Sequence, residues 1–386
     1  MKKIYFLLLI VLGFCSCQKE LSREGSNTNT NTNTSTQVDV YVAGADSLSD
    51  WSIFFYSTHG IPVYWKNGNP VFCRPEPAGY FGGDGGTATA IAVSGNDVYL
   101  TGYAYYCGAR SCHDRGQFWK NGIINNNLDL PDYPGSVTVS NNDIYIAGSS
   151  LYLDGTGGNA GYLKNENHIE LPSSSTGAIS TAIAVSGADV HVAGIGITSN
   201  ANYGSQNYIA KYWKNANAIN LSDGTNDAQA WGIAVSGNDA YVAGMEWNGR
   251  SYQDANGYPN KKSVAKYWKN SQPVILSDGT NDAWTTSFAV SGNDVYVAGM
   301  EWNGKSYQDA NGYPLKKSIA KYWKNGNPVN LTNGTEDAVA RSIAVSGTDV
   351  YVVGMENGYA TYWKNGVAVK LSNANSDATS IFLVKH

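Results

Sequence analysis

Seven copies of the same two short segments constrain this chain more than any other feature of its sequence. In the clearest copies one segment reads Ala-Val-Ser-Gly-Asn-Asp-Val-Tyr-Val-Ala-Gly and the other reads Tyr-Trp-Lys-Asn-Gly. The first segment ends, at spacings of 46 to 58 residues, at Gly44, Gly102, Gly148, Gly194, Gly244, Gly299 and Gly354. The second segment starts its Lys-Asn pair at Lys66, Lys120, Lys164, Lys214, Lys269, Lys324 and Lys364. A period of roughly 40–50 residues with several strands per unit predicts a β-propeller.

Each unit is predicted to contain four strands, and the last unit shows them most clearly. An apolar run at 342–345 is typical of an innermost strand A that is covered on both faces. Strand B covers 350–353, strand C covers 360–363 and strand D covers 367–371. The short Asp-, Asn- and Gly-containing links between A and B and between C and D predict tight hairpin turns. We expect the Trp and Tyr of strand C to pack between adjacent blades.

The two ends of the repeat array complement each other. Residues 38–42 form a strand B without a strand A, and residues 377–384 form a strand A without a strand B. Seven complete units therefore exist only if the C-terminal strand joins the N-terminal blade, which closes the ring and hides its sheet edges. The predicted fold is all-β: one seven-bladed propeller of four-stranded blades in residues 37–386.

The residues before the array have the pattern of an export signal followed by a tether. Lys2 and Lys3 precede an apolar run at 4–14, which is too short to span a bilayer. The Gly-Phe-Cys-Ser-Cys sequence that ends at Cys17 resembles a bacterial lipoprotein box with Cys17 as the lipidated residue. An ordinary secretory signal peptide is the alternative interpretation. Residues 18–36 include an Asn-Thr alternation, carry no apolar periodicity and predict a disordered tether.

Three cysteines remain in the predicted propeller. In the oxidising compartment that export implies, Cys107 and Cys112 are expected to form a disulfide that closes a small loop. Cys73 is then left without an assigned role.

Composition and motifs argue against several function classes. A net charge of −5 gives no sign of a nucleic-acid partner. The five histidines lie in different repeats without metal-ligand spacing. Neither a nucleophile elbow nor a phosphate-binding loop is present. We therefore predict no catalytic residue, no metal site with histidine ligands and no enzyme activity, although paired carboxylates of a glycosidase would be able to meet in space.

The most distinctive links join strands B and C in two neighbouring units. Strands of a blade alternate in direction, so the A–B and C–D turns share one face of the disc, and the B–C and D–A links share the other, which we name the B–C/D–A face. The links at 245–270 and 300–325 differ at only three positions when they are aligned at an offset of 55 residues. Aromatic rings beside amides and carboxylates suit sugars as well as protein epitopes. The candidate ligand-binding residues are Glu246, Trp247, Tyr252, Asp254, Asn256, Tyr258, Glu301, Trp302, Tyr307, Asp309, Asn311 and Tyr313.

These two links have other interpretations. Their Trp and Tyr side chains would equally hold a long loop against its own blade. Asp254 and Asn256, with Asp309 and Asn311, match the start of a calcium loop but lack its later glutamate, so calcium is the one cofactor that the sequence suggests. The D–A links also repeat an acid, at Asp227, Asp282, Asp337 and Asp377. These acids would either cap their own turns or form a ring of carboxylates near the central channel.

The repeats and the N-terminal segment together resemble uncharacterised seven-bladed propeller lipoproteins of Bacteroidetes. Gln18-Lys19-Glu20 after Cys17 is similar to the export signal of such surface lipoproteins. The resemblance implies exposure on the outer face of the outer membrane. We further expect a monomer that contacts the membrane through its lipid anchor only. The leading functional hypothesis is a non-catalytic glycan-binding protein. The alternatives are a module for protein–protein interaction, adhesion or transporter docking, a polysaccharide-degrading enzyme and, by analogy with other anchored propellers, capture of a corrinoid.

Overall fold

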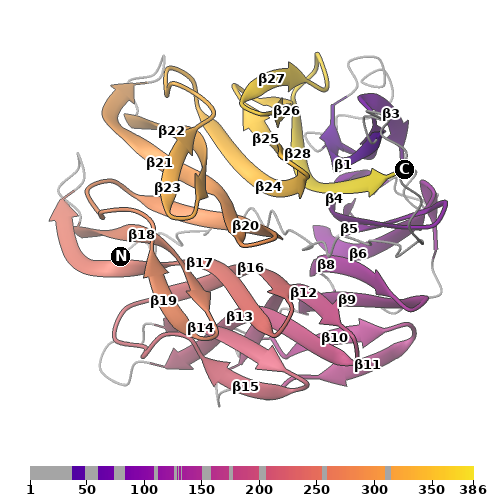
Figure 1. The fold of residues 1–386 in the computed structure, drawn as a ribbon, viewed down its shortest axis with the longest axis horizontal. Coiled ribbons are helices and arrows are strands. Elements are labelled where there is room, and N and C mark those ends of the chain that lie inside the picture. The colour runs from indigo at the N-terminus through magenta and orange to yellow at the C-terminus, as the bar shows by residue number, and fades with distance from the viewer. Residues whose placement is uncertain are drawn as a thin grey trace, which may run out of the picture.

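The computed structural model describes residues 37–47, 60–73, 83–107, 112–125, 128, 130–131, 133–149, 158–173, 177–199, 206–253, 259–308 and 314–386. In these residues, 28 strands form seven four-stranded antiparallel sheets around a ring, and no helix occurs (Figure 1). The predicted seven-bladed propeller is therefore confirmed. We number the sheets as blades 1 to 7 along the chain.

Each blade consists of four strands, A to D, in the order in which they pair. Blade 1 contains β28 (Ser376–Lys385), β1 (Val38–Asp46), β2 (Ile61–Lys66) and β3 (Asn69–Phe72). Blade 2 contains β4 (Gly83–Ser94), β5 (Asp97–Cys107), β6 (Cys112–Lys120) and β7 (Ile123–Ile124). Blade 3 contains β8 (Tyr133–Ser140), β9 (Asp143–Ser149), β10 (Ala160–Lys164) and β11 (Asn167–Glu170). Blade 4 contains β12 (Ala178–Ser186), β13 (Asp189–Ser199), β14 (Gln206–Lys214) and β15 (Asn217–Asn220).

The remaining three blades follow the same order. Blade 5 contains β16 (Ala228–Ser236), β17 (Asp239–Gln253), β18 (Pro259–Lys269) and β19 (Gln272–Ile275). Blade 6 contains β20 (Ala283–Ser291), β21 (Asp294–Gln308), β22 (Pro314–Lys324) and β23 (Asn327–Asn330). Blade 7 contains β24 (Ala338–Ser346), β25 (Asp349–Glu356), β26 (Tyr359–Lys364) and β27 (Val367–Lys370).

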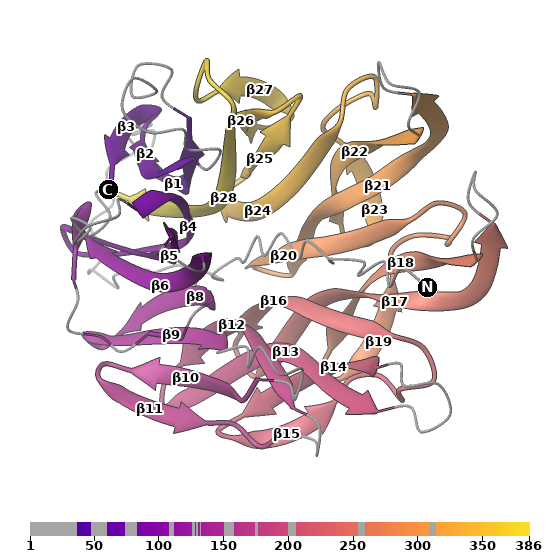
Figure 2. The same ribbon diagram turned by 180° about the vertical axis from the view of Figure 1, so that it is seen from behind.

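The two ends of the array meet in blade 1, as the sequence predicts. Strand β28 pairs antiparallel with β1 from Val38 opposite Lys385 to Asp46 opposite Ser376. Figure 2 shows the yellow β28 lying beside the indigo strands of the first blade. The pairing supplies blade 1 with its innermost strand, so that no blade is left incomplete.

The turns on the A–B/C–D face are short and almost uniform. Wherever the chain links A to B or C to D, the link consists of two residues, for example Asn325 and Gly326 between β22 and β23. Asn325 has a φ of 51° and Gly326 a φ of 84°, the two positive values that a type I′ turn requires. Asn and Gly tolerate this conformation best, which explains why the Lys-Asn-Gly sequence recurs.

Each turn is also fastened to its neighbour on the same face by side chains. In blade 6, Asn325 Nδ2 donates to Asp294 Oδ1 at 2.8 Å, and Lys324 Nζ lies 2.9 Å from Asp294 Oδ2. Asn325 Oδ1 accepts from the backbone N–H of Val295 at 2.8 Å. All seven blades repeat the asparagine–aspartate bond and the lysine–aspartate pair.

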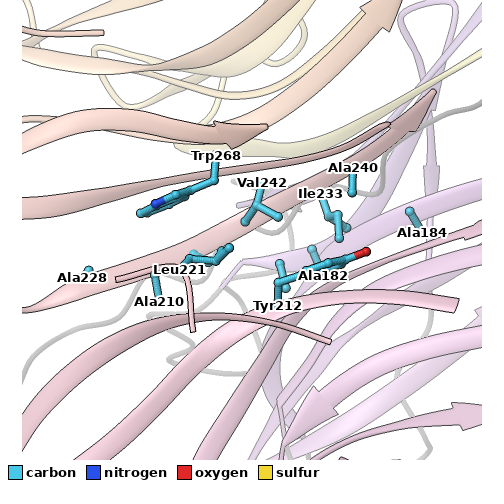
Figure 3. Close-up of a cluster of buried hydrophobic side chains, with 12 residues drawn as sticks. Ala182, Ala184, Ala210, Tyr212, Leu221, Ala228, Ile233, Ala240, Val242 and Trp268 are labelled. Atoms are coloured by element: carbon cyan, nitrogen blue, oxygen red, sulfur yellow. The ribbon is translucent and has the colours of Figure 1, made fainter. Parts of the chain in front are cut away.

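The core lies between blades and is built around strand C. Tryptophan occupies one equivalent position of strand C in six blades and is fully buried there. Figure 3 shows Trp268 of blade 5 in one cluster with Tyr212 and Leu221 of blade 4. This contact confirms that the repeated aromatic residues pack between blades. Truncation of one such tryptophan to alanine would cost roughly 3–5 kcal/mol.

A β-bulge in every strand A joins neighbouring blades near the centre of the ring. The register of strand A against strand B shifts once or more in each blade. In four blades the extra residue is threonine, and its hydroxyl donates to a carbonyl of the next blade. The bonds run from Thr379 to Ala88, from Thr89 to Pro134, from Thr181 to Ala230 and from Thr286 to Ala340 at 2.7–3.0 Å.

Candidate functional site

Two neighbouring blades carry projecting B–C hairpins. In blade 5, β17 has 15 residues and β18 has 11, and blade 6 repeats these lengths in β21 and β22. The corresponding strands of blade 7, β25 and β26, have only 8 and 6 residues. Figures 1 and 2 show the two long hairpins next to each other at the rim of the ring. They are the longest B–C hairpins in the described part of the chain.

The sequence indicates two long loops in the B–C links of blades 5 and 6. In the structure most of each link consists of paired antiparallel strands. Trp247 pairs with Ser263 and Ser251 pairs with Lys261, and a bulge lies between these pairs. Gly249 occupies the bulge with a φ of 69°, and Gly304 has a φ of 74° at the equivalent position in blade 6. The Asn-Gly pair in each link is therefore a bulge within a hairpin, because positive φ suits both structures.

The base of each hairpin is fastened to the D–A connections on either side of it. The backbone N–H of Trp247 donates to the carbonyl of Asp227 at 2.9 Å, and Trp302 donates to Asp282 at 2.8 Å. On the other side, Asn303 Nδ2 donates to the carbonyl of Gly334 at 2.7 Å. Asn248 makes the equivalent bond to Gly279 at 3.3 Å. The two hairpins are thus held in the same way by the same residue types.

Three of the four repeated acids bind strand C rather than their own turns, whereas Asp377 lies in β28 and binds Arg341 of blade 7. Asp282 Oδ1 accepts from the backbone N–H of Ser263 at 2.9 Å, and Asp337 Oδ1 accepts from that of Ser318 at the same distance. Asp227 binds Tyr208 at 2.8 Å in the same way. Capping of the connection itself is done by Asp223, Asp278 and Asn333, each of which accepts from a threonine N–H. The first set of acids therefore clamps the connection to the preceding blade.

The two candidate glutamates are each held by a lysine of the same blade. Lys266 Nζ lies 2.5 Å from Glu246 Oε2, and Lys321 Nζ binds Glu301 Oε2 in the same geometry. The side chains of these lysines are only 11% and 7% exposed, so the pairs lie largely out of water. Each half-buried carboxylate is therefore engaged in an ion pair within its own blade.

The described aromatic candidates are partly exposed, with Trp247 and Trp302 at the base of the hairpins and Tyr307 nearer the tip. Trp247 and Trp302 occupy equivalent positions. Lys316 Nζ lies 4.2 Å from the ring centre of Trp302. Lys317 Nζ lies 5.0 Å from the ring centre of Tyr307, whose hydroxyl accepts from Asn303 at 3.0 Å. These contacts fix the ring orientations while leaving part of each ring accessible.

The tips of both hairpins lie outside the described residues. This applies to Asp254, Asn256, Tyr258, Asp309, Asn311 and Tyr313, and to the side chain of Tyr252. The predicted calcium ligands fall in this set, and the predicted lipidation site Cys17 also lies outside the described residues. Their roles remain predictions. Across the part of the chain that the structure does describe, no three His, Cys, Asp or Glu side chains are grouped so as to hold a metal ion.

The cysteines of the propeller differ in their positions. Cys107 and Cys112 are directly opposite each other in the β5–β6 ladder. Their side chains lie outside the described set, so the disulfide remains a prediction. Cys73 is a buried free thiol whose pKa is raised to about 12 by burial. Such a thiol is inert at neutral pH.

Two further residues interrupt the symmetry near the centre of the ring. Trp231 and Arg341 occupy the bulge position of strand A that is threonine in four blades. Arg341 binds the carboxylate of Asp377 in blade 1 through two nitrogens, at 2.9 and 2.7 Å. Sequence reasoning missed both residues, although alignment of the repeats at an offset of 55 places them with Thr286.

Comparisons with known proteins assign the chain to no family. No protein-family model and no curated protein matches the chain. Among solved structures, YjhT is 11% identical, with 76% of this chain and 96% of that chain covered and a TM-score of 0.35. A Trypanosoma rangeli sialidase mutant is 10% identical, with 91% and 52% covered and a TM-score of 0.39. The β-propeller domain of a Pyrococcus furiosus protease is 8% identical, with 75% and 96% covered and a TM-score of 0.35.

The protein class that these observations define is the seven-bladed β-propeller. At such low identities and TM-scores the solved structures carry no argument about ligand or activity. The described residues contain no helix that would be able to cross a membrane.

Proposed function

We propose that this propeller is a non-catalytic binding protein that captures a glycan on its B–C/D–A face, at the hairpins β17–β18 and β21–β22. The observation that carries the proposal is that the same projecting hairpin occurs on two adjacent blades. Each hairpin is fastened at the same points and holds a partly exposed tryptophan at the same position.

The chemistry at the base of the hairpins suits a saccharide. A sugar ring stacks its apolar C–H face on an aromatic ring, and its hydroxyls bond to amides, carboxylates and ammonium groups. Lys316 places an ammonium group beside the Trp302 ring, where it is able to donate to a sugar hydroxyl. Two equivalent sites on neighbouring blades would bind two segments of one polymer and gain affinity through avidity.

The state of the two glutamates favours binding over catalysis. Glycoside hydrolysis requires two carboxylates in different protonation states across one bond. Glu246 and Glu301 instead occupy equivalent positions in different blades, and each is paired with its own lysine. The proposed location on the cell surface, through a lipid on Cys17, brings such a protein into contact with external polysaccharide.

A glycan array with the purified protein tests this function. The double variant Trp247→Ala/Trp302→Ala is expected to lose at least about 90% of the binding signal, because stacking on each ring contributes on the order of 1 kcal/mol and the two sites act together. Its melting temperature should stay close to that of the unchanged protein.

Two results would redirect the proposal. Binding to no glycan on the array, with capture of a surface protein instead, would favour the protein-interaction alternative. A large fall in melting temperature of the double variant would show that the tryptophans serve packing, and the site would then have to lie elsewhere on the face.

A further inference from the structure

Three consecutive blades carry the same acid at the same place. Glu246, Glu301 and Glu356 are separated by 55 residues and each follows a methionine. The strand register confirms the equivalence, since they lie opposite Ala228, Ala283 and Ala338 at the start of strand A. The three carboxylates are therefore structural equivalents in blades 5, 6 and 7.

In blades 5 and 6 the protein itself supplies a cation for this carboxylate. Lys266 and Lys321 come from strand C, opposite Gly244 and Gly299, and bind Glu246 and Glu301. In two blades this site therefore holds an ammonium group beside the carboxylate.

Blade 7 keeps the acid but lacks the lysine. Thr361 lies opposite Gly354 at the lysine position, and its hydroxyl donates to the carbonyl of Tyr359 at 3.0 Å. Among the described residues, no side chain forms a hydrogen bond or ion pair with the Glu356 carboxylate. The pKa of Glu356 is raised, first by its burial and then by the nearby Glu336. The carboxylate is consequently half-buried without a counter-charge, a state that costs free energy.

Blade 4 has the strand C lysine without the acid, and this lysine binds another residue of the same blade. Lys211 occupies the lysine position, but Gly196 replaces the acid. The stem of Lys211 lies against Gly196, where a Cβ would be 2.3 Å from its Cε, and its ammonium group donates to Asn220 at 2.9 Å. An unmatched lysine is therefore given an internal partner, whereas the unmatched Glu356 is not.

Glu356 lies at the edge of the proposed glycan site. Glu336, which acts on it electrostatically, lies 3.3 Å from Lys317 Nζ. Lys317 in turn lies over the ring of Tyr307 in the blade 6 hairpin. The short Asn357-Gly358 turn of blade 7 gives this carboxylate no long hairpin of its own.

We propose that Glu356 binds an ammonium group of the ligand, and that the glycan therefore contains amino sugars with a free amine. This inference rests on the proposed function. The ligand's ammonium group would take the place that Lys266 and Lys321 take in the sister blades. The interaction is a charge-assisted hydrogen bond, which is stronger than a bond between neutral groups and is lost when the amine is acetylated.

Calorimetric titration with two matched probes tests the inference. The probes are an oligomer of glucosamine and an oligomer of N-acetylglucosamine of the same length. The unchanged protein is expected to bind the glucosamine oligomer about tenfold more tightly. Glu356→Gln should abolish this preference, because a neutral amide offers no charge to the ammonium group.

A second variant and a control variant distinguish loss of the glucosamine preference from a folding defect. Thr361→Lys supplies the missing internal ammonium group, so it should remove the preference while preserving or raising the melting temperature. Asp294→Asn removes one negative charge on the opposite face and should leave the preference intact.

Each other outcome overturns the inference in a recognisable way. Equal affinity for both oligomers, with loss of binding in the Trp247→Ala/Trp302→Ala variant, would overturn the amino-sugar inference and leave the proposed function standing. Binding of neither oligomer would overturn the inference, and the glycan array would decide on the function separately. Binding of a lysine-rich peptide that depends on Glu356, without binding of either oligomer, would assign the carboxylate to a protein partner.

Discussion

On the A–B/C–D face every blade joins an aspartate, a lysine and an asparagine in one arrangement, whereas the B–C/D–A face uses charge differently from blade to blade. Blade 4 has the strand C lysine without the acid, blades 5 and 6 have both, and blade 7 has the acid without the lysine. The first face shows what each four-stranded unit needs in order to form its turns. The second face shows where the units are free to differ, which is the property that a ligand site requires.

The largest expected effect comes from breaking an internal pair on the variable face. Lys321→Met leaves Glu301 half-buried without its cation and should lower the free energy of unfolding by about 2 kcal/mol. Lys324→Met, three residues further along the same strand, removes an exposed pair and should cause little change. Urea denaturation measures both. Equal losses for the two variants would contradict the distinction between the faces.

A smaller loss is expected from the repeated turn on the other face. Asn325→Ala removes two side-chain hydrogen bonds and places alanine at a φ of 51°, so it should cost about 1 kcal/mol. Asn325→Gly, which restores the conformational freedom but not the hydrogen bonds, should recover part of the loss. Thermal denaturation distinguishes the two contributions. No recovery by glycine would show that the hydrogen bonds alone matter.

A gain in stability is expected where the variable face is incomplete. Thr361→Lys would build in blade 7 the pair that blades 5 and 6 contain, and should raise the free energy of unfolding by about 0.5 kcal/mol. The double variant Thr361→Lys/Glu356→Gln serves as the control, since its lysine has no carboxylate to bind. If the single variant is less stable than the double variant, the blades are not equivalent at this position.

The smallest expected effect is a difference in pH dependence between the faces. The pKa of Asp294 lies below its ordinary value of 3.8 because Asn325 and Lys324 bind its carboxylate. The stability that this aspartate contributes is present above its ordinary pKa of 3.8 and is lost as the pH falls through its pKa in the folded state. Glu356 behaves in the opposite sense.

The pKa of Glu356 lies above its ordinary value of 4.5, so the folded state favours its protonated form. Its contribution to stability is full below the ordinary pKa of 4.5 and is lost as the pH rises through the folded-state value. Glu356→Gln should therefore become more stable relative to the unchanged protein as the pH rises from about 4 to 7. Urea denaturation across this range measures the trend. A constant difference would show that Glu356 is not perturbed by folding.

The fold follows from local signals in the sequence that repeat seven times. The Lys-Asn-Gly and Ser-Gly-Asn-Asp turns specify hairpins, because few other residues adopt positive φ without cost. The unmatched strands at 38–42 and 377–384 specify the ring closure, because a strand B without a strand A leaves an open edge. The turn signals lie within a few consecutive residues, and the two incomplete units at the ends of the array complete each other. A single sequence is therefore enough to find both.

The site was predicted less completely, because its properties depend on pairings between distant residues. The Asn-Gly sequences at 248–249 and 303–304 indicate loops when they are considered alone, yet they form bulges within long hairpins. The acid of Asp282 binds a backbone N–H 19 residues earlier in the chain, which no local pattern indicates. Trp231 and Arg341 stand out only when the repeats are compared with one another, and their place in the bulges of strand A comes from the strand register.

The sequence by itself determined the seven units, their turns, the closure of the ring and the face on which variation is concentrated. The tertiary structure alone decided which charges are paired. Lys321 and Glu301 are 20 residues apart, and only the register of β21 against β22 brings their side chains together. The same register in blade 7 places Thr361 where a lysine would have bound Glu356. The free energy of a half-buried charge is set by its neighbours in space, so this distinction has no local signature in the sequence.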